Sequence, residues 1–409
     1  FHNCMKSIFK QKLLCETACG HDGKLVNLLK LIKIAKKCGA QNIKFQIFKT
    51  WERALLDTKE WKIFSKLELT ETEWKKSIEF SKKNKLKVFA DIYGNDSFNI
   101  ANELNVDGFK IHSEDFFNTY FIQKVLERKK PVLLSVGGTY RSELYELVSW
   151  LFKKKKLNKN TFLVPGIQIF PTPLKDHYIN EIIDLKNKYT KFGVKVGYAD
   201  HISGDDPISE IFPFMALSAG ADFVEKHFTD SRKFKRTDYH SALDQKQLNL
   251  FINTLNSLDC VFKKLGPFSI NENKYRKMFK KTIVLSNDKF IKDKIDAREI
   301  NFVKNTTVSS SLFSHAVTNK KVIRKLTKIL PLNLKYINQN IGAIIVVRLN
   351  SNRFPDKALK KINGVPSIIL LIRRLKKIKN INSITLATSS SARDKKLKKF
   401  ADMEKINFF

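Results

Sequence analysis

The feature that most constrains the fold is a regular alternation of short apolar segments with amphipathic ones, which runs from the start of the chain to about residue 265. The apolar segments are rich in β-formers, and the amphipathic ones have the period of a helix, as residues 24–39 show. A strand followed by a helix, repeated along a chain, is typical of parallel βα units. The pattern predicts eight strands, at residues 12–18, 42–48, 86–92, 108–113, 131–137, 161–169, 195–201 and 222–228.

Eight βα units are most simply accommodated by an α/β fold of the closed (β/α)8 TIM-barrel type. A doubly wound open sheet stays as the alternative, because periodicity alone does not show closure. After Gly266 the pattern changes to short strands and polar turns, which we expect at 279–289, 295–306 and 329–337. A third pattern begins at Ile341, where an apolar strand, a polar loop and a helix open another α/β domain.

These changes predict three domains, at residues 1–268, 269–340 and 341–409. The first is the barrel, the second is small and β-rich, and the third is the N-terminal part of a Rossmann-like α/β domain. The chain begins at a phenylalanine and stops before the third sheet could be completed, so we expect it to be a fragment of a longer protein.

The net charge of +36 raises the question of nucleic-acid binding, because clustered lysine and arginine bind phosphate backbones. The excess is mostly lysine spread over every amphipathic segment, which favours solvated helix faces and leaves nucleic acid as a minor alternative. The positive field would still attract small anions. The sequence has no run of about 18 apolar residues and no leader with a cleavage site, so we expect a cytoplasmic protein without a membrane partner.

Polar side chains stand at the ends of nearly all the predicted strands. In a (β/α)8 barrel the active site lies at the C-terminal ends of the strands, so these positions are functional candidates. They are Glu16, Lys44, Gln46, Lys110, Ser113, Ser135, Gln168, Asp200, His201, Lys226 and His227.

Two of these residues, Lys44 and Lys110, are lysines within apolar strands. Such a lysine is costly to bury unless it meets an anion or another partner. Either one alone could instead extend its ammonium out of the strand end. Together with the hydroxyls of Ser113 and Ser135, they favour a pocket for phosphate or carboxylate.

His201 and His227 end neighbouring strands. Neutral imidazoles in such positions can bind one divalent metal and leave coordination positions open for water or substrate. Taken alone, two histidines are also compatible with structural or hydrogen-bonding roles.

Seven sequence blocks, in order and at the strand ends, resemble the sialic acid synthase family (N-acetylneuraminate synthase and relatives). ETACGHDG resembles E-I-G-x-N-H-x-G, KFQIFK resembles K-F-Q-x-F/H, and FKIHSED resembles F-K-I-x-S-x-[DE]. LLSVGG, IQIFPTP, GYADHISG and VEKHFTD are similar to I-L-S-T-G-M, N-x-Y-P-T-P, G-x-S-D-H-T-x-G and E-K-H-F-T. The resemblance covers about 260 residues.

The resemblance implies condensation of phosphoenolpyruvate with an N-acylamino sugar to give a nonulosonic acid and phosphate. It implies that His201 and His227 bind Mn²⁺ or Mg²⁺. Lys44, Lys110, Ser113 and Ser135 would bind phosphoenolpyruvate, with Lys110 also acting in the reaction. The residues near the sugar would be Glu16, Gln46, Asp115, Gln168 and Asp238, of which Glu16 and Asp115 would handle protons. The alternative enzyme is a related 3-deoxy-keto-acid phosphate synthase that takes a phosphorylated aldose.

Several positions depart from the family's blocks. The third strand reads ADIYG where many members have S-T-P-F, so Asp91 stands at a position that is often threonine. Ala199, Gln168 and Phe170 replace serine, asparagine and tyrosine. These departures leave the sugar open among N-acetylmannosamine, a diacetamido-dideoxy sugar and a phosphorylated form.

Residues 269–340 resemble, more faintly, the antifreeze-like (SAF) domain that follows such barrels. In the family this domain comes from the other subunit of a homodimer and closes the active site with an arginine in R-P-G-x-G, so a homodimer is expected here. FVKNTTVSSS stands in that place, and Lys304 is its one nearby cation.

The loop RLNSNRFPDK is similar to the R-x-x-S-x-R-[LF]-P-x-K loop of sugar-nucleotide cytidylyltransferases. The resemblance implies that Arg348, Ser351, Arg353 and Lys357 bind the triphosphate of CTP, and arginine suits that role because its guanidinium matches phosphate geometry. A basic surface loop is the alternative. The family's metal-binding aspartate would lie beyond Phe409, so we expect CTP activation of a nonulosonic acid only from a longer, bifunctional protein.

Overall fold

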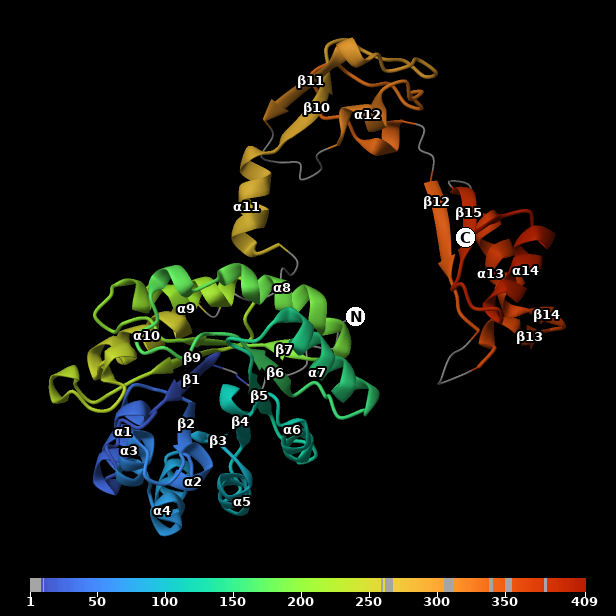
Figure 1. Cartoon of the computed structure of the whole chain (residues 1–409). Helices are drawn as coiled ribbons and strands as arrows, with labels where there is room; N and C mark the ends of the chain where they lie inside the picture. Colours follow the sequence, from blue (N-terminus) through green and yellow to red (C-terminus); the bar gives the residue numbers. More distant parts are fainter. Residues whose placement is uncertain are drawn as a thin grey trace. The chain divides into compact units, whose positions relative to one another are not determined.

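The computed structural model describes residues 9, 11–258, 260–261, 268–304, 312–337, 341–349, 355–378 and 381–409. The chain divides into two compact units, Phe1–Lys264 and Leu265–Phe409. The first unit is a barrel of parallel strands surrounded by helices (Figure 1).

The strands of the barrel stand at all eight predicted places. Their order in the sheet is β7-β6-β5-β4-β3-β2-β1-β9-β8, and every pair is parallel. They are β1 Leu13–Glu16, β2 Asn42–Ile47, β3 Lys87–Ile92, β4 Gly108–Ile111, β5 Val132–Ser135, β6 Thr161–Val164, β7 Lys195–Val196, β8 Tyr198–Asp200 and β9 Val224–His227.

The two ends of this order, β7 and β8, are consecutive parts of the predicted strand 195–201, separated by Gly197. Gly197 N donates to Leu163 O on one side (2.9 Å), and Tyr198 N donates to Phe223 O on the other (3.0 Å). One extended segment therefore joins β6 to β9 and closes the ring. A side chain at Gly197 would not fit, because its Cβ would lie 2.3 Å from a ring carbon of Phe223. The closed barrel is confirmed, and the open sheet is excluded.

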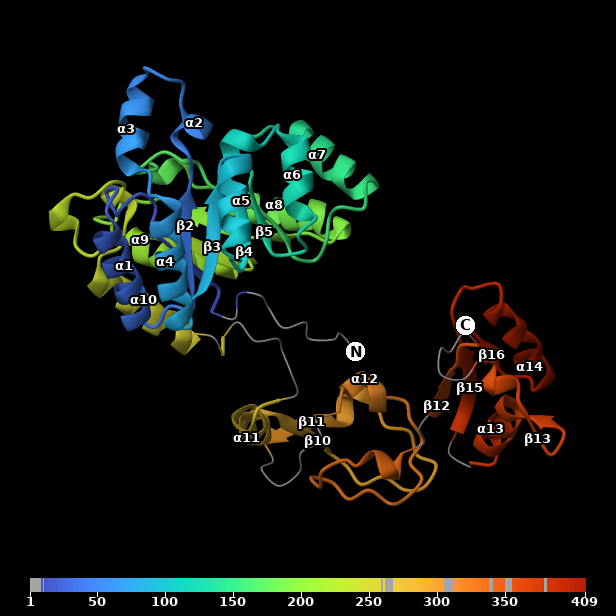
Figure 2. The ribbon, with the colours of Figure 1, turned by 90° about the horizontal axis from the view of Figure 1, so that it is seen from below.

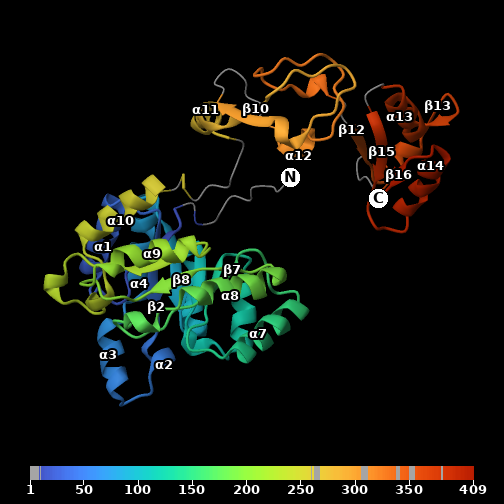
Figure 3. The same ribbon diagram turned by 90° about the horizontal axis from the view of Figure 1, so that it is seen from above.

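Helices cover the outside of the barrel, as the views from opposite sides in Figures 2 and 3 show. In α1, Leu28, Leu31, Ile32 and Ala35 recur at helical spacing and are buried against the sheet. The helices are α1 Leu25–Lys37, α2 Thr50–Arg53, α3 Lys59–Leu67, α4 Glu71–Lys83, α5 Asn95–Glu103, α6 Thr119–Leu126, α7 Arg141–Lys153, α8 Ile179–Tyr189, α9 Ile208–Ser218 and α10 Gln245–Leu258.

One part of the barrel interior is filled by apolar side chains. Phe9 is 1% exposed and stacks on Phe89 and Phe223, with ring centroids 5.1 and 4.1 Å apart. Leu14, Leu133 and Phe162 belong to the same cluster. Side chains two positions apart in a strand point to the same face, so the residues that follow Leu14, Phe89 and Phe223 at this spacing also point inward. These residues are polar: Glu16, Asp91 and Glu225. The apolar cluster therefore leaves the C-terminal ends of the strands for polar chemistry.

Residues 268–337 have a small core of their own. Strands β10 Lys281–Leu285 and β11 Ile300–Lys304 pair antiparallel, after α11 Ile270–Phe279 and before α12 Ser314–Val317. The core contains Ile283, Leu285, Ile295, Val317, Val322, Leu326, Leu332 and Ile337.

The strands predicted at 279–289 and 295–306 thus contain β10 and β11, whereas the strand predicted at 329–337 was wrong. That segment forms a 3-10 turn at Leu334–Tyr336 and one bridge from Ile337 to Val322. Pro331 has no N–H to donate to a ladder, and the side chain of Asn333 accepts from Lys335 N (2.9 Å), which favours a turn.

The C-terminal residues form an α/β layer. Strands β12 Ile341–Val346, β15 Ile381–Ala387 and β16 Asn407–Phe408 are parallel, with α13 Ser367–Lys376 and α14 Lys398–Met403 packed on them. A short hairpin joins β13 Lys361–Ile362 to β14 Val365–Pro366. The division between 340 and 341 stays a prediction. Within the described residues, no helix combines the length and apolarity that crossing a bilayer requires.

Candidate active site

The C-terminal end of β9 carries alternating polar side chains that point to opposite faces of the barrel wall. Glu225 and His227 continue the inward face of Phe223, which belongs to the interior cluster. Lys226 lies on the opposite face, where its Nζ is 2.9 Å from the carboxylate of Asp200 on β8. Asp200 and Lys226, both predicted at strand ends, therefore form an ion pair on the outward face of the strands.

Two lysines and three carboxylates meet inside the barrel. Lys44 Nζ lies 2.9 Å from Glu225 Oε1 and 3.0 Å from Asp91 Oδ2, and it also contacts Glu16 Oε2. Lys110 Nζ lies 2.7 Å from the same Glu225 oxygen and 3.9 Å from Asp91 Oδ2. All five side chains are at most 2% exposed. Both predicted anion-binding lysines thus face the lumen, where they form one charged cluster.

The cluster changes how readily its members ionise. Burial lowers the pKa of the Lys44 ammonium, although Asp91 and Glu225 oppose it. Burial has the same tendency at Lys110, but Glu225 and Asp91 outweigh it and raise its pKa. Burial alone would raise the pKa of Glu225, whereas Lys110 and Lys44 hold it well below its usual range. Glu225 is therefore ionised at neutral pH.

A group of potential metal ligands adjoins this cluster. Ligand atoms of His201, Glu225 and His227 all lie within 4.8 Å of one another, and all three residues are buried. His201 Nδ1 is 2.8 Å from Ile167 O, so if Nδ1 donates to that carbonyl, Nε2 remains free to bind an ion.

His227 Nδ1 and Glu225 Oε2 are buried without a hydrogen-bond partner in the described part of the chain. Burial lowers the pKa of His201 to about 3 and that of His227 well below its usual value, so both imidazoles are neutral, the form that binds metals. Two neutral imidazoles and a carboxylate fit a divalent cation. Glu225 was not predicted, although its i, i+2 spacing from His227 within a strand places both on one face.

Of the residues expected near the sugar, Glu16 and Gln46 lie within β1 and β2, and Asp115, Gln168 and Asp238 lie on segments that follow strands. Cys19 links two of them, because its Sγ is 3.4 Å from Gln46 Oε1 and its backbone N is 3.4 Å from Asp238 Oδ2. Ser113 Oγ donates to Gln168 Oε1 (3.2 Å). The structure thus brings Gln46 and Asp238 to one shared neighbour, and Ser113 and Gln168 into direct contact.

Of the remaining predicted residues, Ser135 is buried at the end of β5, and Asp115 ends a 3-10 turn at Ser113–Asp115. Asp115 Oδ1 accepts a hydrogen bond from Asn118 Nδ2 (3.2 Å). Burial raises the pKa of Asp115 and also that of Asp238. Both carboxyl groups therefore take up a proton at a higher pH than an exposed aspartate does.

Arg53 in α2 adds a cation that the sequence did not reveal. Its guanidinium lies over the rings of Phe64 and Tyr93, 4.0 and 4.1 Å from their centroids, and bonds Glu114 (3.1 Å). Its Nε and the hydroxyl of Tyr93 are buried without a partner among the described residues. No motif points to Arg53, because these neighbours come from three separate segments.

In the second unit, Arg348 follows β12 and Lys357 begins a 3-10 turn, and both are exposed. Ser351 and Arg353 lie outside the described residues. Asp394 accepts from Leu349 N (2.8 Å) and Ser389 Oγ (2.5 Å), which fixes the chain directly after Arg348. Lys304 is exposed on β11, with its Nζ 5.2 Å from the ring centroid of Phe279.

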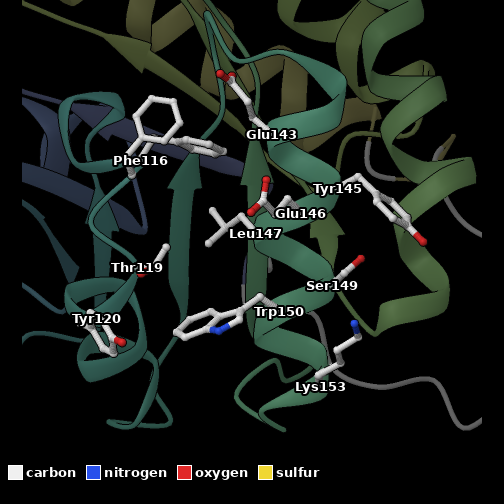
Figure 4. A pocket seen from close by; sticks show the side chains of 11 residues that line it. Phe116, Thr119, Tyr120, Glu143, Tyr145, Glu146, Leu147, Ser149, Trp150 and Lys153 are labelled. Atoms are coloured by element: carbon white, nitrogen blue, oxygen red, sulfur yellow. The ribbon is translucent and has the colours of Figure 1, made fainter.

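A cavity of about 640 Å³ opens on the outside of the barrel between α6 and α7 (Figure 4). Aromatic side chains dominate its lining, among them Phe116, Tyr120, Tyr145 and Trp150, beside the carboxylates of Glu143 and Glu146. None of the predicted site residues lines it, and Lys44, Lys110, His201 and His227 lie inside the barrel. We therefore place the candidate active site in the lumen.

Comparisons with known proteins identify the family to which the barrel belongs. Residues 31–265 match the NeuB family, and residues 342–408 match a cytidylyltransferase family. An uncharacterized protein of Methanocaldococcus jannaschii is 31% identical over 254 residues, which cover 62% of this chain and 72% of that protein. An N,N'-diacetyllegionaminic acid synthase of Campylobacter jejuni is 26% identical over 297 residues, covering 68% and 86% of the two chains.

Among solved structures, the N-acetylneuraminic acid synthetase of Leptospira borgpetersenii, in complex with citrate, has a TM-score of 0.58 and 27% identity. That similarity covers 66% of this chain and 92% of the other. The NeuB match extends over more than half of the chain and includes every barrel strand except the first. The chain therefore belongs to the NeuB family, and its C-terminal residues carry part of a cytidylyltransferase domain.

Proposed function

We propose that the barrel condenses phosphoenolpyruvate with the open-chain form of an N-acylamino sugar to give a nonulosonic acid and inorganic phosphate. The observation that carries the proposal is the convergence of two buried lysines and a His–Glu–His group on one lumen. Relatives named as legionaminic and pseudaminic acid synthases support the class of product.

The lysines account for recognition of an anionic substrate. Lys44 and Lys110 would donate to the phosphate and carboxylate of phosphoenolpyruvate, and the hydroxyls of Ser113 and Ser135 would add hydrogen bonds. His201, Glu225 and His227 would hold a divalent cation such as Mn²⁺ or Mg²⁺. That ion would supply Lewis-acid polarisation of the sugar aldehyde.

The reaction forms one carbon–carbon bond and releases phosphate. C3 of phosphoenolpyruvate attacks the aldehyde carbon, the aldehyde oxygen takes a proton, water adds at C2, and cleavage of the C2–O bond releases phosphate. Asp115, whose pKa burial raises, suits a proton-transfer role, as does Glu16 beside Lys44. Gln46, Gln168 and Asp238 would position the sugar through hydrogen bonds.

Phosphate release from phosphoenolpyruvate, measured with a panel of sugars, tests the proposal. The panel contains N-acetylmannosamine, its 6-phosphate, a diacetamido-dideoxy sugar and arabinose 5-phosphate. Metal-dependent release with one of the acylamino sugars is the expected result. Release with arabinose 5-phosphate alone would identify a 3-deoxy-keto-acid phosphate synthase instead. Absence of release with every sugar, from folded and metal-loaded protein, would contradict both.

We further propose that residues 341–409 belong to a domain that binds CTP. The match to a cytidylyltransferase family supports this, as does the anchoring of Leu349 by Asp394. Arg348, Ser351, Arg353 and Lys357 would contact the triphosphate. Titration of the whole chain with CTP and ATP tests the proposal: Arg348→Ala should weaken CTP binding, while Arg324→Ala, an exposed arginine elsewhere in the second unit, should not. Equal binding by both variants would contradict it.

A further inference from the structure

Carboxylate oxygens crowd the ammonium of Lys44. Of its three N–H donors, two form hydrogen bonds to Asp91 Oδ2 and Glu225 Oε1, and Glu16 Oε2 is a third close contact as an ion pair. Carboxylate oxygens of Glu16, Asp91 and Glu225 all lie within salt-bridge distance of Lys44 Nζ, and the four side chains are at most 1% exposed. An anion that binds Lys44 must therefore displace one of these carboxylates.

Asp91 is the carboxylate held least firmly by other groups. Glu16 also accepts from Ala18 N through Oε1 (2.5 Å), and Glu225 Oε1 is shared with Lys110 at 2.7 Å. Asp91 Oδ2 is 3.0 Å from Lys44 but 3.9 Å from Lys110, and its Oδ1 is buried without a partner in the described part of the chain. Displacing Asp91 therefore breaks the fewest other interactions.

We propose that Asp91 competes with phosphoenolpyruvate for the donors of Lys44 and Lys110, and that it thereby sets the affinity of the barrel for this substrate. The inference rests on the proposed function, because it requires the two lysines to hold phosphoenolpyruvate. Asp91 is in this respect an affinity-determining residue of the substrate pocket.

The charges of the cluster indicate that Asp91 competes with an anionic substrate and is not needed only to hold the fold together. Three carboxylates face two ammonium groups, which leaves the cluster with a formal charge of −1. Without the charge of Asp91, Glu16 and Glu225 balance Lys44 and Lys110, and each lysine keeps a carboxylate within contact distance. The fold should therefore tolerate a neutral residue at position 91, and a neutral cluster should accept an anion more readily.

Binding and steady-state kinetics of Asp91→Asn and Asp91→Thr test this inference. Asn preserves the shape but replaces one carboxylate oxygen by an NH2 group, and Thr has a single hydroxyl oxygen; both remove the charge. Both variants should bind phosphoenolpyruvate about tenfold more tightly by calorimetry, the effect of one hydrogen bond to a charged group, and should lower its KM similarly. The KM for the sugar should stay unchanged. Glu103→Gln, which removes an exposed carboxylate at the end of α5, is the matched charge control and should alter neither constant.

Tighter binding cannot result from structural damage, so it separates competition from a structural role. Unchanged or weaker binding of phosphoenolpyruvate by both variants, with wild-type melting temperatures, would overturn the proposal. Failure of both variants to fold would also overturn it, because it would show that Lys44 requires the charge of Asp91. If the wild type releases no phosphate with any sugar, the proposed function fails. If it does, and the variants bind no more tightly, only the inference about Asp91 fails.

Discussion

Replacement of Lys110 by methionine separates the structural contribution of a buried lysine from its contribution to substrate binding. Methionine keeps an unbranched side chain of similar length and removes the charge. In the variant, Glu225 would lose the contact at 2.7 Å and would keep Lys44, at 2.9 Å, as its one lysine partner among the described residues.

Two effects of different size follow from this change. The lost donor to phosphoenolpyruvate should raise KM by about 10- to 100-fold, because a hydrogen bond to a charged group contributes about 1.5–3 kcal/mol and a tenfold change corresponds to about 1.4 kcal/mol. Removal of one partner from a buried ion pair should lower the free energy of unfolding by about 3 kcal/mol.

Initial rates at varied phosphoenolpyruvate concentration and urea unfolding measure the two effects separately. The double variant Lys110→Met/Glu225→Gln should recover much of the lost stability, since it leaves no unpaired carboxylate, but should not recover the low KM. A normal KM for phosphoenolpyruvate in folded Lys110→Met would refute the reasoning, because it would place this ammonium outside the substrate pocket.

Three further predictions concern the metal, the pH dependence of stability and the barrel interior. His227→Ala should retain less manganese after dialysis, by atomic absorption, than wild type or the exposed-residue control His240→Ala; equal retention in all three would rule out His227 as a ligand. Burial lowers the pKa of His21 to about 4, so on acidification the unfolded chain takes up a proton at this histidine before the folded chain does. The free energy of unfolding should therefore fall by about 3 kcal/mol between about pH 6.5 and pH 4. Urea unfolding of His21→Gln should show a smaller fall than wild type over the same range. Phe9→Ala should lower the free energy of unfolding by about 3–5 kcal/mol, and a loss below 1 kcal/mol would mean that the ring is not a core residue in solution.

The eight strand positions were predictable because strand alternation and helical periodicity are local properties of the sequence. The break of the seventh strand at Gly197 was not predicted, because it reflects a change of hydrogen-bonding neighbour from β6 to β9, which only the closed barrel brings together. The strand predicted at 329–337 was wrong for a local reason. Its apolar residues were given more weight than Pro331 and Asn333, which favour a turn.

The site was predictable as a set of positions but not as a set of contacts. The sequence indicates that Lys44 and Lys110 need anionic partners, yet nothing local shows that Glu225, more than 100 residues away, supplies an oxygen to both. Asp91 was visible as a departure from the family's blocks, whereas its competition for Lys44 depends on distances. Arg53 could not be found at all, because the rings around it assemble only in the folded chain.

The pair of Asp200 and Lys226 behind the barrel wall has a consequence for mapping the active site by mutation. The pair joins β8 to β9 one residue before His201 and one residue before His227, so the spacing of the two imidazoles depends on an ion pair on the opposite face of the barrel wall. A scan that scores only lost activity would count Lys226 among the residues of the pocket. Its loss should instead lower the affinity for the metal, so that added metal restores activity, and should leave the choice of sugar unaltered.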